Sequence, residues 1–86
     1  MQTKTLSARF AICISARPEE DLVVGKVYHV IADKSAADVA GLRVVDESGE
    51  DYLYAASRFV MLNVPQAERV RLLKAMKRRS ASLAGN

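Results

Sequence analysis

The stretch LRVVDESGEDYLYAASRFVML, residues 42–62, decides the fold of this 86-residue chain. Leu42, Val44 and Val45 favour a strand, and the acidic run at 46–51 contains the turn pair Ser48-Gly49. Apolar residues on both sides of such a turn predict a β-hairpin with a solvated tip. The next four residues, 55–58, favour one tight helical turn, after which the chain resumes as a strand at 59–62.

Side chains alternate between the two faces of a strand, so Leu53 is expected to point away from Tyr52 and Tyr54. Upstream, alternating apolar residues predict strands at 9–15 and 26–32, and one helical turn is expected within 35–39. Leu53 and the apolar face of the second strand are expected in the core. The full expected core is Cys13 or its neighbours, Leu22, Tyr28, Val30, Val44, Leu53 and Val60.

Length and composition indicate one small globular domain, with 50% hydrophobic and 27% charged residues. A single cysteine rules out an internal disulfide and favours a reducing compartment. Residues 1–8 are polar and expected to be frayed, and no signal peptide or membrane span is predicted. The expected location is therefore the cytoplasm, with no membrane partner.

Charge is distributed unevenly along the chain. Residues 66–86 carry six Lys and Arg against one Glu, whereas residues 1–65 carry seven cations and nine acids. Pro65 suits a first helical turn, and Ala67, Val70, Leu73 and Met76 recur at helical spacing. The pattern predicts an amphipathic helix at 65–79 after a domain at 1–64, followed by a disordered tail at 80–86. The predicted basic face consists of Arg69, Lys74, Lys77 and Arg78.

The order of these elements resembles an SH3-like barrel over about residues 10–62. Four landmarks carry the resemblance: a turn-like segment at 20–26, the tight turn at Ser48-Gly49, the strand-to-turn segment at 52–56, and the closing strand at Phe59-Val60. The pattern GKVY…VVDESGEDYLY is also similar to small bacterial SH3-like proteins of unknown function. The resemblance implies a mainly β fold, a five-stranded barrel with one C-terminal α-helix, and no particular activity.

The chain departs from peptide-binding SH3 domains at the surface that those domains use. It has no Trp, no aromatic residue in its first loop, and Tyr54 where such domains place a proline. Recognition of proline-rich segments is therefore not expected. A smaller interaction groove lined by Tyr52, Tyr54 and Phe59 remains the hypothesis for the barrel surface.

No combination of residues predicts catalysis or metal binding. His29 and Cys13 are the only soft ligands, too few for a zinc site, and each is expected to be structural. The acids Asp46, Glu47, Glu50 and Asp51 match no calcium loop, and the chain lacks a phosphate loop or nucleophile elbow. We expect no enzyme activity and no cofactor.

Two functional hypotheses follow. The first is a non-catalytic protein-interaction or accessory module with an unidentified protein partner. The alternative is a small nucleic-acid-binding protein that uses the basic helix. The apolar stripe of that helix is expected to pack on the barrel or on a second copy, giving a monomer or a homodimer.

Overall fold

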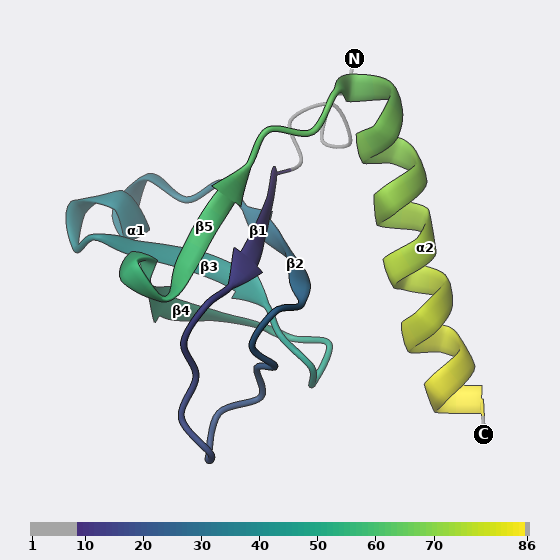
Figure 1. Cartoon of the computed structure of the whole chain (residues 1–86), viewed down its shortest axis with the longest axis horizontal. Helices are drawn as coiled ribbons and strands as arrows, with labels where there is room; N and C mark the ends of the chain where they lie inside the picture. The colour runs from purple at the N-terminus through teal and green to yellow at the C-terminus, as the bar shows by residue number, and fades with distance from the viewer. Residues whose placement is uncertain (1–8, 86) are drawn as a thin grey trace.

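The computed structural model describes the backbone of residues 9–85 and the side chains of residues 9–77. It contains one antiparallel sheet of five strands (Figure 1), namely β1 (Arg9–Cys13), β2 (Val27–Ile31), β3 (Gly41–Val45), β4 (Asp51–Ala55) and β5 (Phe59–Leu62). A short helix, α1 (Lys34–Asp38), joins β2 to β3, and a 3₁₀ turn, η1 (Ala56–Arg58), joins β4 to β5. The long helix α2 (Gln66–Gly85) follows. The predicted mainly β class with one C-terminal helix is confirmed.

The sheet is open rather than closed into the barrel that we expected. Its strand order is β4-β3-β2-β1-β5, and no ladder joins β4 to β5 within residues 9–85. The η1 turn carries the chain from one edge of the sheet to the other, where β5 pairs with β1. Both β4 and β5 are therefore edge strands.

Alternation along the strands produces one buried inner face. Ala11 and Cys13 of β1, Tyr28 and Val30 of β2, and Val44 of β3 belong to the same buried cluster. Leu22 from the β1–β2 loop and Phe59 from β5 complete it. The predicted core positions on β2 and β3 are thus confirmed, as are Cys13 and Leu22.

Leu53 and Val60 are exceptions, because the prediction that they are buried is wrong. Their side chains are 48% and 49% exposed, and the inward positions of β4 and β5 belong to Tyr54 and Phe59. The reason is register: Leu53 pairs with Arg43, whereas Tyr54 pairs with Leu42 on β3. A shift of one residue would move every side chain of β4 to the other face of the sheet. The pairing of β4 with β3 therefore decides which of its side chains are buried.

Local signals in the sequence explain the connections. Asp33 caps α1, since its Oδ1 accepts hydrogen bonds from the backbone N–H groups of Ser35 and Ala36. Its other oxygen pairs with Arg43 at 2.7 Å, and this guanidinium holds the pKa of Asp33 below its usual value. In the predicted hairpin turn, Gly49 adopts φ +88°, a conformation that favours glycine.

Helix α2 stands beside the sheet and faces its outer side (Figure 1). Phe10 lies on this outer side, next to the His29 ring with 5.7 Å between ring centroids, and is fully buried. Leu73 and Met76 of α2 are half-buried toward the sheet. The helix extends past residue 79 to Gly85, in keeping with the helix-favouring alanines and leucine of 81–84. The division into domains stays a prediction.

Candidate functional site

The three aromatic residues of the predicted groove do not share one exposed surface. Phe59 is buried, and its ring meets the Tyr54 ring edge-on at a centroid distance of 6.2 Å. On its other side, Phe59 meets Tyr28 at 6.4 Å in a T-shaped arrangement. Tyr54 is half-buried, and Tyr52 is 48% exposed. Phe59 and Tyr54 therefore help to form the core, while the Tyr52 ring is about half exposed.

The acidic hairpin explains how these tyrosines are held. The Tyr54 hydroxyl donates to Asp46 Oδ2 at 2.6 Å, while Asp46 Oδ1 accepts from the Ser48 backbone N–H at 2.9 Å. Asp46 is buried, at 6% exposure, which differs from the solvated position expected for this run of acids. A buried carboxylate needs such donors. Burial and the hydrogen bond to Asp46 raise the pKa of Tyr54 far above its usual value, so its hydroxyl stays a donor.

Glu47 performs a similar task on the other side of the hairpin. Its Oε2 accepts from the Tyr28 hydroxyl and from the Lys26 ammonium, both at 2.5 Å. The Val23 backbone N–H donates to the same Tyr28 oxygen at 2.7 Å. Burial raises the pKa of Tyr28, and the hydrogen bond to Glu47 raises it further. Asp46 and Glu47 are thus both engaged in hydrogen bonds that fix the hairpin.

Strand β4 forms an uncovered edge of the sheet, which we call the β4 edge and define as residues Asp51–Ala55. Four of its five side chains are exposed, and Tyr54 is half-buried. Tyr52 and Leu53 project from opposite sides of this strand. Since β4 pairs only with β3, the backbone groups on its other side have no strand partner within the described chain.

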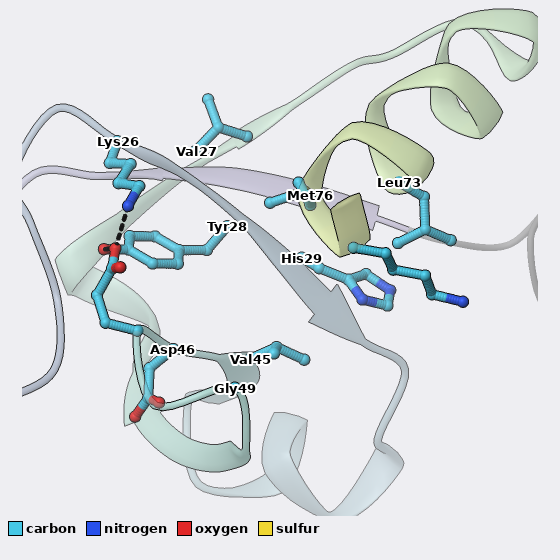
Figure 2. Close-up of a pocket in the computed structure, with 11 residues that line it drawn as sticks. Lys26, Val27, Tyr28, His29, Val45, Asp46, Gly49, Leu73 and Met76 are labelled. Carbon is cyan, nitrogen blue, oxygen red and sulfur yellow. Dashed lines mark hydrogen bonds and ion pairs between the residues drawn. The ribbon is translucent and has the colours of Figure 1, made fainter. Parts of the chain in front are cut away.

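A cleft lies between α2 and the outer side of the sheet, with a volume of about 360 Å³. We call it the helix cleft. Figure 2 shows Val27 and His29 on β2 and Val45 on β3, with Leu73 and Met76 of α2 nearby. The Lys26–Glu47 ion pair also lines the cleft. Its walls are mainly apolar, and Lys77 contributes a second cation.

His29 and Lys77 are electrostatically coupled in this cleft. Partial burial lowers the pKa of His29, and the positive charge of Lys77 lowers it further. His29 is therefore neutral at neutral pH. No carboxylate among residues 9–77 forms an ion pair with Lys77. Sequence reasoning treated His29 as a structural residue and missed this cleft, because the contact depends on where α2 lies.

The predicted basic residues of α2 occupy different faces. Lys74 is exposed, as expected, whereas Arg69 is half-buried and its Nε donates to the Val64 carbonyl at 2.8 Å. Lys77 lines the helix cleft, and the side chain of Arg78 lies outside the described residues. Arg71, which the prediction omitted, is 79% exposed and pairs with Glu68 at 3.2 Å. Positions 69, 73 and 76 are spaced four and three residues apart, so they form one helical stripe. That stripe would have predicted that Arg69 is half-buried along with Leu73 and Met76.

Cys13 and His29 do not form a joint site. Cys13 belongs to the inner cluster, while His29 lies on the outer side of the sheet beside Phe10. Within the described residues, no group of three or more His, Cys, Asp or Glu side chains is arranged to hold a metal ion. None of the helices in that part of the chain is long and apolar enough to span a membrane.

Comparison with protein-family models, with curated proteins and with solved structures gives no match for this chain.

Proposed function

We propose that this protein is a non-catalytic interaction module with an SH3-like fold, and that it binds an extended segment of a partner protein along the β4 edge. Three features support the SH3-like assignment: the strand order β4-β3-β2-β1-β5, the long loop between β1 and β2, and the η1 turn before the last strand. Such folds host many functions, so the choice of function depends on the surface.

The exposure of β4 is the observation that carries the proposal. A free edge offers backbone N–H and C=O groups that an added strand can pair with, and proteins usually protect such edges. Here Tyr52 and Leu53 extend from the two sides of the strand, each about half exposed. Tyrosine is enriched in protein interfaces because its ring contributes large contact area at little entropic cost. Main-chain pairing would supply affinity, and these two side chains would supply selectivity.

The arrangement of the polar groups favours binding over catalysis. Asp46 and Glu47 are both held in structural hydrogen bonds, and Glu20 pairs with Arg58 at 2.7 Å. Within residues 9–77, no hydrogen bond connects His29 to a serine or cysteine. A nucleophile activated by an adjacent base requires such a contact.

Site-specific photo-crosslinking in cells tests the proposal. A photoreactive amino acid placed at Leu53 is expected to yield a discrete adduct with one partner protein. The same amino acid at Val24, an equally apolar exposed residue in the β1–β2 loop, provides the matched control. Leu53→Lys should abolish co-purification of that partner, because a charge on an edge strand opposes pairing. Equal labelling from both positions, or adducts formed only from Val60 on β5, would contradict it.

A second candidate is nucleic-acid binding through the outward cations of α2. Arg71 and Lys74 are exposed on the side of the helix that faces away from the sheet. Such cations bind phosphates without reading sequence, and the resulting affinity depends strongly on salt. Cytoplasmic location, a bacterial source and association through α2 likewise remain proposals.

A further inference from the structure

We infer that the helix cleft is a binding site for a small apolar monocarboxylate, such as a medium-chain fatty acid. The proposal concerns the outer side of the sheet and is independent of any partner at the β4 edge. It rests on the volume of the cleft, the chemistry of its walls and the placement of Lys77.

The shape and lining suit a small apolar molecule. Binding pockets for small molecules usually measure roughly 300–1,000 Å³ and have mainly apolar walls with a few polar groups. At about 360 Å³, the helix cleft is at the small end of this range. Val27 and Val45 of the sheet line it together with Leu73 and Met76 of α2 (Figure 2). The space between these four side chains is suited to an aliphatic chain.

Of the residues that the structure describes, two cations and two acids line the cleft, and both acids are already hydrogen-bonded: Glu47 accepts from Lys26 and Tyr28, and Asp46 accepts from Ser48 and Tyr54. Lys77 has no carboxylate partner among residues 9–77, and the neutral His29 ring beside it has an N–H to donate. One ammonium and one neutral donor match the single charge and two oxygens of a carboxylate. A dianionic phosphate would require a second free cation, and among the described residues the other cation that lines the cleft, Lys26, is already paired with Glu47.

Ligand titration followed by two-dimensional ¹H–¹⁵N NMR tests the inference on the full chain. Sodium octanoate, kept below its micelle-forming concentration, should shift the resonances of Val27, His29, Val45 and Leu73 in a saturable manner. Lys77→Met should weaken octanoate binding at least about tenfold, because a charged hydrogen bond is lost. Lys74→Met removes the same charge from the exposed side of α2 and should leave binding unchanged.

Two further comparisons complete the design. Octanol has the same chain without the charge, so it should bind more weakly than octanoate and should not respond to Lys77→Met. Val45→Trp should block binding by filling the cleft, and Met76→Trp serves if the first variant does not fold. Three results would overturn the inference: no saturable shifts, equal binding of octanol and octanoate, or a dimer in solution with cleft residues at its interface. None of them affects the crosslinking result at β4.

Discussion

Phe59 connects the two tyrosines of the inner face, and its position shows how single residues set the core. Its ring lies between those of Tyr28 and Tyr54, whose hydroxyls reach Glu47 and Asp46 respectively. The apolar cluster thus ends at a layer of hydrogen-bonded carboxylates. Edge-on aromatic pairs of this kind add about 0.5–1.5 kcal/mol beyond the area that they bury.

Replacement of Phe59 by Ala is therefore expected to lower the free energy of unfolding by about 3–5 kcal/mol, because it leaves a cavity between two rings. Leu53→Ala is the matched comparison on the exposed side, where the loss should stay below about 1 kcal/mol. Urea denaturation followed by circular dichroism measures both. Equal losses would show that the register of β4 is wrong.

The second prediction at this scale concerns His29 and pH. Burial and Lys77 hold the pKa of His29 below its ordinary value of 6.5, so the unfolded chain binds this proton more readily than the folded chain. Stability supplied by the neutral ring should be present above about pH 6.5 and should be lost as the pH falls toward the lowered value. The unfolding free energy of His29→Gln should therefore decline less between about pH 7.5 and pH 5.5 than that of the unmodified chain.

NMR titration of the imidazole provides the direct check. Lys77→Met should raise the pKa of His29, because it removes the second cause of the depression, whereas Lys74→Met should not. Identical titration curves for all three proteins would show that the charge of Lys77 does not affect the pKa of His29.

At the scale of elements, α2 differs from the strands in how it is stabilised. The strands are joined by ladders, whereas α2 faces the sheet across the helix cleft, which Leu73 and Met76 line. An isolated helix of about 20 residues is only marginally stable in water, so its order depends on contacts such as that of Leu73. The buried part of one leucine contributes on the order of 1 kcal/mol.

Leu73→Asp should consequently detach α2 without unfolding the sheet. Amide hydrogen exchange within α2 should accelerate roughly tenfold, since local opening becomes easier, while exchange in β1–β3 stays unchanged. Ala75→Asp introduces the same charge at an exposed position of the helix and serves as the control. Acceleration in the strands as well would indicate that α2 and the sheet unfold as one unit.

At the scale of the whole molecule, the feature with a functional consequence is the uneven distribution of charge along the chain. The chain carries a net charge of +3, with an excess of cations in residues 66–86. Such an asymmetry can attract a polyanion to one end of the molecule and is screened by salt over about 10 Å at 0.1 M.

If the nucleic-acid hypothesis holds, a labelled oligonucleotide should bind at low salt and dissociate steeply as salt rises. The double variant Arg71→Gln, Lys74→Gln should weaken this binding more than Arg17→Gln, Lys34→Gln, which removes equal charge elsewhere. Fluorescence anisotropy measures both. Absence of binding by the unmodified protein at low salt would eliminate the hypothesis.

The sequence by itself determined the local features of this protein. Alternation at 26–32 predicted β2, Ser48-Gly49 predicted the hairpin turn, and Pro65 with the spacing of Val70, Leu73 and Met76 predicted α2. These features depend on the backbone preferences of single residues and on the spacing of apolar residues along the chain. Both can be read directly from the amino-acid sequence.

Tertiary structure decided which of two equivalent faces became the core and where the helix came to lie. Leu53 and Tyr54 are adjacent and both apolar enough to be buried, and only pairing with β3 placed Tyr54 inside. His29 and Lys77 are 48 positions apart, so no local pattern connects them. The helix cleft exists because α2 covers the outer side of the sheet incompletely, and such packing depends on contacts between distant segments.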